Sequence, residues 1–219
     1  MIELFALPVS AYCAKVRIAL ELKGIDFRET PPPDGYGSST YCAIVPAGSI
    51  PAIRDGSFVL HDADAILEYL DEQTPDPALL PRGVRDRALV RSLARFHDSE
   101  YEPRVRAFFP LIGAVGADLD SRVEYAVKEL QQVHARFESL VIPHCTPMPF
   151  PVDSGVNKAD LCYAPTIRMA RRILSEFGID LRLRDAIARW LDAVDGVPAV
   201  ARSQTMMSNA LEGWISSKS

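Results

Sequence analysis

The first 73 residues alternate short apolar runs with segments whose apolar side chains recur at helical spacing. The run IELFAL predicts a strand, residues 11–23 predict an amphipathic helix, and IDFRET predicts a second strand. A strand, a helix and a strand in this order form a β-α-β unit, in which a right-handed crossover places the two strands in parallel.

The same region continues with one hairpin and two further helical segments. SSTYCAI indicates a short helix, and the runs PAIRD and FVLH flank the dipeptide Asp55-Gly56. Asp-Gly between two apolar runs is typical of a tight hairpin turn. Helical spacing returns from Asp62 to about Gln73.

The segment TPDPALLPRG interrupts this pattern, because its prolines can neither continue a helix nor join the interior of a sheet. We expect a linker there. Beyond it four apolar stripes follow one another at helical spacing: Leu89, Leu93 and Phe96; Val123, Val127, Leu130, Phe137 and Val141; Leu161, Ala164, Ile173 and Phe177; and Ile187, Trp190, Leu191 and Val194. The pattern predicts a small α/β unit followed by a helical bundle.

Composition excludes several classes of protein. With 219 residues, 48% hydrophobic side chains and a net charge of −5, the chain has an ordinary globular composition and no basic excess for binding nucleic acid. Cys13, Cys42, Cys145 and Cys162 are far apart and form no C-x-x-C, so we expect reduced thiols and no metal site. The N-terminus lacks the basic region of a signal peptide, and no apolar run could cross a membrane. We therefore expect a cytoplasmic protein.

Several motifs, taken in order, resemble the soluble glutathione transferases: LPVSAYCAKVRIAL, PAGSIPAI, LHDADAILEYL and PALLP, with VNKADLCYAP in the helical half. The resemblance covers nearly the whole chain. It implies a thioredoxin-like, glutathione-binding domain over residues 1–81 and an all-helical, substrate-binding domain over residues 82–219. It also implies a homodimer of the cytosolic, serine-type, bacterial-like group, with a role in detoxification.

The resemblance assigns the catalytic role to Ser10, whose hydroxyl would donate to the sulfur of bound glutathione. Ser10 precedes the first predicted helix, where unpaired N–H groups and the helix dipole favour an anion such as a thiolate. A hydrogen bond to a charged group contributes about 1.5–3 kcal/mol, enough to lower a thiol pKa from about 8.5 to about 6.5–7.5. The alternative is that Ser10 is only a helix cap.

Two neighbours compete with Ser10 for a chemical role. Cys13 closes an S-x-x-C sequence, but it would lie one helical turn inside, farther from the unpaired N–H groups. A buried cysteine usually behaves as a small apolar residue. Tyr12 carries the other hydroxyl of this segment and is a second candidate donor to the sulfur.

The remaining site residues are also implied by the resemblance. Ile50-Pro51 matches a cis peptide bond of the family, which presents the main chain of Ile50 to the cysteinyl part of glutathione. Asp62-Ala63 stands where most members have Glu-Ser. Asp62 would hold the ammonium of the γ-glutamyl group, whereas Ala63 offers only its backbone N–H to the carboxylate. The missing hydroxyl predicts weaker glutathione binding, by about 10- to 150-fold.

The second substrate, a small electrophilic or aromatic molecule, would bind between the domains. His97, Tyr101 and Arg104 carry polar groups suited to such a ligand, although each could instead be solvated or tied in contacts between helices. His134 shares an apolar stripe and is expected to be packed and hydrogen bonded, and His61 could reach the glycyl end of glutathione.

Three functions are compatible with this pattern. The first is a glutathione transferase acting on a hydrophobic electrophile. The second is a glutathione-dependent isomerase, dehalogenase or ether-cleaving enzyme, although zeta-type isomerases carry Ser-Ser-Cys where this chain has Ser10-Ala11-Tyr12. The third is a non-catalytic binding protein on the same fold, which Ala63 favours.

Overall fold

The computed structural model describes residues 1–144, 152 and 155–218, and its N-terminal part holds a four-stranded sheet with the order β2-β1-β3-β4. The strands are β1 (Ile2–Phe5), β2 (Phe27–Thr30), β3 (Ala52–Asp55) and β4 (Phe58–His61). β1 pairs in parallel with β2 and antiparallel with β3, which pairs antiparallel with β4. The predicted β-α-β unit and the hairpin around Asp55-Gly56 are therefore confirmed.

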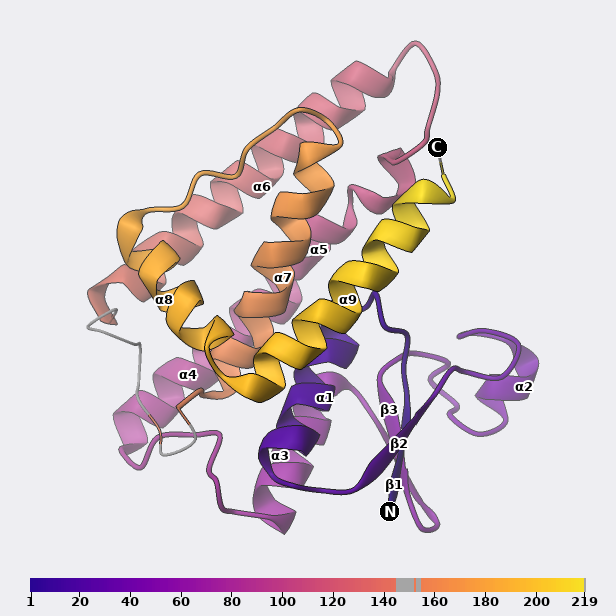
Figure 1. Ribbon diagram of the computed structural model, residues 1–219, viewed down its shortest axis with the longest axis vertical. Coiled ribbons are helices and arrows are strands. Elements are labelled where there is room, and N and C mark those ends of the chain that lie inside the picture. Colours follow the sequence, from indigo (N-terminus) through magenta and orange to yellow (C-terminus); the bar gives the residue numbers. More distant parts are fainter. Residues whose placement is uncertain (145–151, 153–154, 219) are drawn as a thin grey trace.

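Three helices cover the two faces of this sheet: α1 (Ala11–Leu22), α2 (Ser39–Cys42) and α3 (Ala63–Gln73). In Figure 1, α1 and α3 lie on the side of the sheet that faces the helical half, and α2 lies on the other side. The side chains of β1 alternate accordingly. Leu4 belongs to the main core together with α1, whereas Phe5 packs with Tyr41 in a separate small cluster.

Residues 74–83 contain neither helix nor strand, as the prolines predict, and the described chain beyond them is helical. Its elements are α4 (Val84–Phe96), the π-helical turn η1 (His97–Tyr101), α5 (Glu102–Arg106), η2 (Phe109–Leu111), α6 (Leu119–Val141), η3 (Ile142–His144), α7 (Lys158–Ser175), α8 (Asp185–Asp195) and α9 (Pro198–Ser216). Helix α7 lies at the centre of the bundle and packs against α1, α4, α8 and α9. Within the described ranges, no helix has the length and apolarity needed to cross a bilayer.

One of the predicted apolar positions, Leu89, is wrong. Leu89 is 40% exposed, because α4 buries Val90, Leu93 and Ala94 instead. The next buried position of this face is the polar His97, so the buried face of α4 does not stand out as an apolar pattern in the sequence. Phe177 lies just beyond the end of α7, where it is half-buried and packs against the core, as predicted. Cys145, counted among the expected free thiols, lies outside the described residues.

Helix α1 joins the two halves of the molecule partly through buried charges. Lys15 has no exposed side-chain surface, and its Nζ lies 2.8 Å from Oδ1 of Asp98 in η1. Arg17 pairs with Glu29 at 2.6 Å and donates to the Ser203 hydroxyl of α9 at 3.1 Å. Basic side chains are buried only where such partners offset the loss of hydration. These contacts hold the first helix, and with it the segment before it, against the helical half.

A capping box begins α7. The Asn157 side chain accepts from the N–H groups of Ala159 (2.8 Å) and Asp160 (3.3 Å), and the Asp160 carboxylate accepts from the Asn157 N–H at 2.7 Å. Asp160 also accepts from the indole N–H of Trp190 at 2.7 Å, and burial raises its pKa to about 7. The role that the sequence predicted for Asn157 and Asp160 is confirmed as structural.

Replacing Asn157 with alanine is expected to lower the free energy of unfolding by about 1–2 kcal/mol, because two buried N–H groups lose their acceptor. Urea unfolding followed by circular dichroism measures this change. Asn209→Ala, at an exposed position inside α9, is the matched control and is expected to leave stability unchanged or slightly raised. Equal stability of Asn157→Ala and the unmodified protein would contradict the assignment.

Candidate active site

The register of the sheet brings three of its strand ends to one edge. Phe5 of β1 pairs with Ala52 of β3, and Ala52 pairs with His61 of β4. The chain leaves this edge after Phe5 and after His61 and enters it just before Ala52. The segments that contain Ser10, Ile50-Pro51 and Asp62-Ala63 therefore all start or end at the same edge of the sheet, although they are far apart in sequence.

Ser10 is the N-cap of α1, with extended backbone angles of φ −81° and ψ 122°. Its Oγ accepts from the N–H of Cys13 at 3.3 Å, and its own N–H donates to the Leu7 carbonyl at 3.1 Å. The cap uses a lone pair of the hydroxyl oxygen, so it does not consume the O–H group as a donor. The structure thus confirms Ser10 as a helix cap, and the cap leaves its O–H available as a hydrogen-bond donor.

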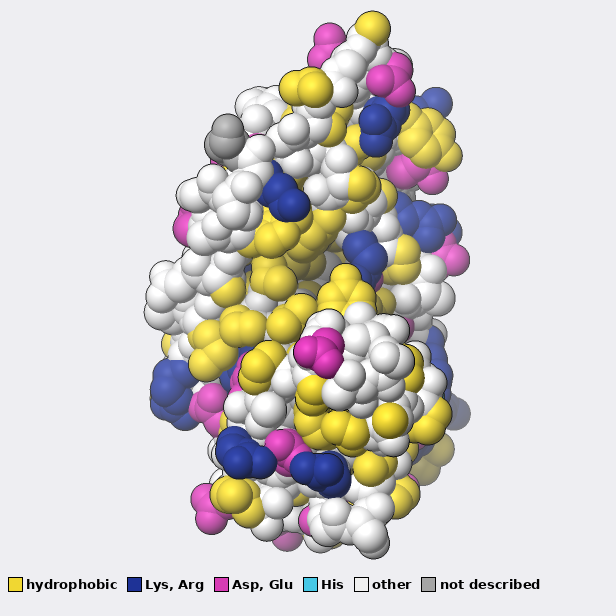
Figure 2. All heavy atoms as spheres, turned by 90° about the vertical axis from the view of Figure 1, so that its right-hand side faces the viewer, with side chains coloured by type: hydrophobic (Ala, Val, Ile, Leu, Met, Phe, Trp, Pro, Cys, Tyr) yellow, Lys and Arg dark blue, Asp and Glu magenta, His cyan; other side chains and the backbone are white. Residues whose placement is uncertain are grey.

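A cavity of about 350 Å³ opens beside Ser10, between the sheet edge and the helical half. Its lining from the N-terminal part is Leu7, Val9, Ser10, Ala11, Tyr36, Ser49 and Ile50, and its lining from the helical half is Glu102, Arg106, Phe109, Met169 and Trp214. Figure 2 shows hydrophobic side chains gathered in a hollow of the surface that faces right in Figure 1. A mostly apolar hollow with a few polar groups is what small-molecule sites share.

The Ile50-Pro51 peptide bond is cis, as the resemblance predicted. Ile50 lines the cavity, and Pro51 directly precedes β3. Neither the N–H nor the C=O of Ile50 is hydrogen bonded to another residue in the part of the chain that the structure describes. A residue that offers both a free N–H and a free C=O can bind the main chain of a peptide ligand as a neighbouring strand would.

Asp62 is the N-cap of α3 and has a positive φ of 76°. Its Oδ1 accepts from the N–H groups of Asp64 (3.0 Å) and Ala65 (2.9 Å). Asp62 is exposed, Ala63 is 5% exposed, and neither lines the cavity around Ser10. The structure therefore places these two residues at the same sheet edge as Ser10 but outside the cavity itself.

The two competitors of Ser10 are not placed at the cavity. Cys13 is buried, and burial raises the pKa of its thiol to about 11. The Tyr12 hydroxyl donates to the carbonyl of Asp98 at 3.2 Å, and burial raises its pKa well above the usual range. Neither group lines the cavity, and neither is prepared to ionise near neutral pH.

The helical half supplies a wall that the sequence did not identify. Phe109 and Trp214 lie side by side with ring centroids 4.8 Å apart, and Met169 of α7 belongs to the same lining. Glu102 and Arg106 are the charged residues of the lining. Their i,i+4 spacing is a sequence signal for an ion pair, but spacing alone does not tell a pair facing a cavity from one facing solvent.

The polar residues suggested for the second substrate lie elsewhere. His97 and Tyr101 have no exposed surface, because His97 bonds to Asp98 and Thr166 at 2.7 Å each and Tyr101 bonds to His134 at 2.8 Å. The last contact confirms that His134 is packed and hydrogen bonded. Arg104 lines a separate depression between α5 and α6. His61 is exposed at the end of β4 and does not line the cavity.

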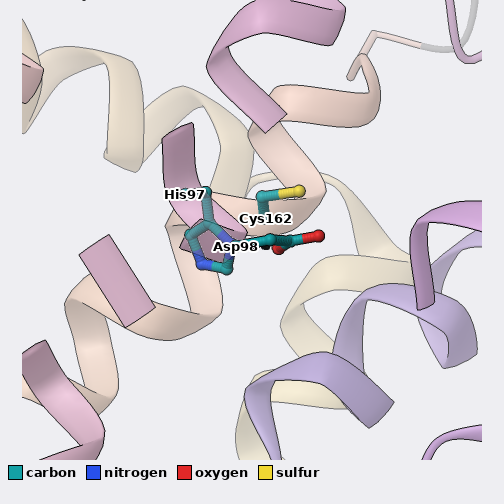
Figure 3. A group of neighbouring side chains, drawn as sticks. All are labelled: His97, Asp98 and Cys162. Atoms are coloured by element: carbon teal, nitrogen blue, oxygen red, sulfur yellow. Dashed lines mark hydrogen bonds and ion pairs between the residues drawn. The ribbon is translucent and has the colours of Figure 1, made fainter. Parts of the chain in front are cut away.

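Another group of potential ligand atoms lies behind α1, where His97, Asp98 and Cys162 come within 4.8 Å of one another (Figure 3). This arrangement resembles a metal site, but the ammonium group of Lys15 already fills it. Lys15 Nζ lies 2.8 and 2.9 Å from the two carboxylate oxygens of Asp98 and 3.7 Å from Cys162 Sγ. A cation would have to displace a buried, paired ammonium, so we interpret the group as a buried ion pair.

Comparison with known proteins identifies the family. A family model described as the N-terminal domain of glutathione S-transferase matches residues 4–78. A glutathione S-transferase of Triticum aestivum is 30% identical over 193 residues, which cover 87% of each chain. The maleylacetoacetate isomerase of Rattus norvegicus is 31% identical over 172 residues, which cover 76% of this chain and 75% of the relative.

A solved structure, the tau-class glutathione S-transferase of Mangifera indica, matches with a TM-score of 0.80 over 97% of this chain and 96% of that chain, at 20% identity. This likeness confirms the expected fold: a thioredoxin-like N-terminal sheet with helices, followed by a helical bundle. The identity to the wheat protein extends over most of both sequences. The chain therefore belongs to the glutathione S-transferase family.

Proposed function

We propose that the protein is a glutathione transferase in which Ser10 stabilises the thiolate of glutathione for attack on a small hydrophobic electrophile. One observation carries this proposal: Ser10, whose hydroxyl caps α1, and Ile50, whose main-chain groups bond to no other described residue, line the same cavity. A thiolate needs the first, and the cysteinyl main chain of a peptide needs the second.

The remaining contacts of glutathione are proposed from the sheet edge. The peptide is held at Ile50 and Pro51, and its γ-glutamyl end extends toward Asp62 and Ala63. Oδ1 of Asp62 serves the helix cap, which leaves Oδ2 for the ligand's ammonium. At Ala63 the backbone N–H at the start of α3 faces the ligand's carboxylate, with the helix dipole in support.

The proposed chemistry needs one proton transfer and one bond change. The thiol proton of glutathione leaves to solvent, and the Ser10 O–H donates to the resulting thiolate. The sulfur then forms a bond to the electrophilic carbon. In a displacement, that carbon releases its leaving group with the bonding electrons; in an addition, the π electrons move away from that carbon and the atom that receives them takes up a proton from solvent. Ser10 stays un-ionised throughout, so it serves as a hydrogen-bond donor rather than as a nucleophile.

Further assignments belong to the same proposal. We assign the chain to the cytosolic, serine-type, bacterial-like group on the motif around Ser10, and expect a cytoplasmic homodimer that uses neither a metal nor nucleic acid. We place the division between the glutathione-binding and substrate-binding domains after residue 81, within the segment 74–83 that lacks regular structure. Light scattering after size exclusion tests the dimer.

A glutathione-dependent isomerase is the second candidate, because the rat relative described above is named a maleylacetoacetate isomerase. An isomerase returns the thiolate after each turnover, whereas a transferase consumes it. Measuring free thiol during turnover of an unsaturated substrate separates the two: stoichiometric loss of thiol supports the transferase, and constant thiol supports the isomerase.

Binding of glutathione is the first test of the proposal. Glutathione at 10 mM is expected to raise the melting temperature by about 3–10 °C, if its dissociation constant is about 0.1–1 mM. Cysteinylglycine, which lacks the γ-glutamyl group, is the control ligand and is expected to give a smaller shift. No shift with either ligand would instead favour a non-catalytic member of the family.

A further inference from the structure

Arg106 is held from two directions at the wall of the cavity opposite the sheet edge. Its Nε and Nη2 donate to the two carboxylate oxygens of Glu102, at 3.2 and 2.5 Å. Its guanidinium carbon also lies 5.3 Å from the centroid of the Tyr12 ring, a cation–π contact. Two contacts of different kinds fix the plane of the guanidinium, which lowers the entropy cost of using it to bind a ligand.

One edge of this guanidinium is not used by the residues that the structure describes. No residue within the described ranges accepts a hydrogen bond from Nη1 of Arg106. The side chain is 57% exposed, whereas that of Glu102 is 3% exposed. Both residues line the cavity, but the Glu102 carboxylate is almost fully buried, so the Arg106 cation is the partner with exposed surface for a ligand.

The neighbouring surface suits a flat apolar group. Phe109 and Trp214 form an aromatic pair in the same lining, and Met169 adds a flexible thioether that adapts to ring shapes. Apart from Glu102 and Arg106, the lining residues are uncharged. Among the described lining residues, a ligand that reaches from Ser10 along this wall thus meets aromatic surface and one accessible charge, the positive charge of Arg106.

We propose that the second substrate is an aromatic electrophile bearing a carboxylate or a similar anionic group, and that Arg106 is the residue that selects this anion. The proposal rests on the transferase function proposed above, because it concerns the partner that the thiolate attacks. Glu102 orients Arg106, but its negative charge also weakens the attraction of the cavity for an anion.

The test uses 4-chloro-3,5-dinitrobenzoate and its methyl ester, which share their shape and reacting carbon and differ in charge. Attack by the glutathione thiolate forms a carbon–sulfur bond at the carbon bearing chlorine, chloride leaves with the bonding electrons, and the thiol proton goes to solvent. The two S-aryl glutathione products are also prepared chemically. Their dissociation constants are measured by calorimetry, which requires no turnover by the protein.

The unmodified protein is expected to bind the acid product more tightly than the ester product. Arg106→Gln is expected to lower this preference by about 5- to 20-fold. This is the loss expected for one charge-assisted hydrogen bond whose strength is reduced by partial exposure to solvent. Glu102→Gln is expected to raise the preference by about 2- to 5-fold, because it removes the opposing charge. A purely structural role of the pair would shift both variants in the same direction.

Arg104→Gln is the matched control, since Arg104 lies two residues earlier, pairs with Glu100 and lines a different depression. It is expected to leave the preference unchanged. If Arg106→Gln fails to fold because Glu102 loses its partner, the double variant Glu102→Gln/Arg106→Gln leaves no unpaired charge, and its preference is expected to fall below that of Glu102→Gln.

The binding result decides this inference, and the turnover result decides the proposed function. Equal affinity of the two products for the unmodified protein, or equal losses for acid and ester in Arg106→Gln, overturns the role of Arg106. An equal loss of affinity for glutathione itself also overturns it, because Arg106 would then bind glutathione and not the second substrate. If the protein binds the acid product selectively but turns over neither of the two aryl chlorides, the result supports the role of Arg106 and contradicts the proposed transferase function.

Discussion

Replacing Ser10 with alanine is expected to lower the turnover number with glutathione and an aryl chloride by about 10- to 100-fold. The variant loses a hydrogen bond to a charged sulfur, which contributes about 1.5–3 kcal/mol. The KM for glutathione is expected to change less, because the proposed contacts at Ile50 and Asp62 remain. Initial rates at saturating glutathione measure the effect.

The pH profile gives the same prediction an independent readout. With Ser10 present, the rate is expected to rise with pH through a thiol pKa of about 6.5–7.5, because the deprotonated sulfur is the nucleophile. Without the hydroxyl, the midpoint is expected to move up toward about 8.5, the value for an unperturbed thiol. The deficit of Ser10→Ala should therefore shrink as the pH rises toward 9.

Loss of a helix cap is the confounding effect in this experiment, and the chain offers a matched control. Ser38 is the N-cap of α2 and accepts from the Tyr41 N–H at 3.1 Å, as Ser10 does from Cys13. Ser38→Ala is expected to lose about 0.5–2 kcal/mol of stability and to retain turnover. Equal activity of the two variants at neutral pH would sink the catalytic role of Ser10.

Much of the fold could be predicted because its signals are local. Alternating strand patterns, the Asp55-Gly56 turn and the proline-rich segment each depend on neighbouring residues, and each corresponds to an observed element. The last helix, α9, had no separate prediction. Its sequence mixes serine, threonine, glutamine and methionine, so the buried stripe through Met207, Leu211 and Ile215 is weak.

The candidate site also has one part that local sequence patterns predict and one part that they do not. Ser10, Ile50-Pro51 and Asp62 follow strand ends whose register can be argued from the sequence, and the resemblance supplies their roles. The opposite wall depends on how helices pack far apart in the chain. Phe109 and Trp214 meet at 4.8 Å although 105 residues separate them, and no local pattern announces that contact. His97 is polar but fully buried against Asp98 and Thr166, and no local pattern distinguishes it from a ligand-binding histidine.

Replacing Asp98 with asparagine is expected to lower the free energy of unfolding by about 3–5 kcal/mol, the largest effect on stability that we predict. Lys15 Nζ has Asp98 at 2.8 and 2.9 Å, and its side chain is fully buried. Asparagine keeps an oxygen acceptor but removes the negative charge, so a buried ammonium group remains without its directly paired carboxylate. Urea unfolding measures the loss.

The acid side of the stability curve tests the same charge. Burial alone would raise the pKa of Asp98, but the hydrogen bond from His97 and the charge of Lys15 together hold it below the usual value. A carboxyl whose pKa is lower in the folded state stabilises the protein above its unfolded pKa, about 3.9, and loses that contribution as the pH falls further. Asp98→Asn is expected to lack this part of the acid destabilisation.

The two partners of this ion pair differ in burial, so replacing Lys15 is expected to have a smaller effect than replacing Asp98. Lys15→Met leaves the Asp98 carboxylate, whose side chain is 24% exposed and still bonded to His97 at 2.7 Å, so the expected loss is about 1–3 kcal/mol. Lys15→Met/Asp98→Asn leaves no isolated charge and is expected to recover most of the stability lost in Asp98→Asn. Additive losses in the double variant would mean that Lys15 and Asp98 do not interact. Because this pair ties the helix that begins after Ser10 to the turn that precedes Glu102, recovery would also identify the contact that sets the two walls of the cavity against each other.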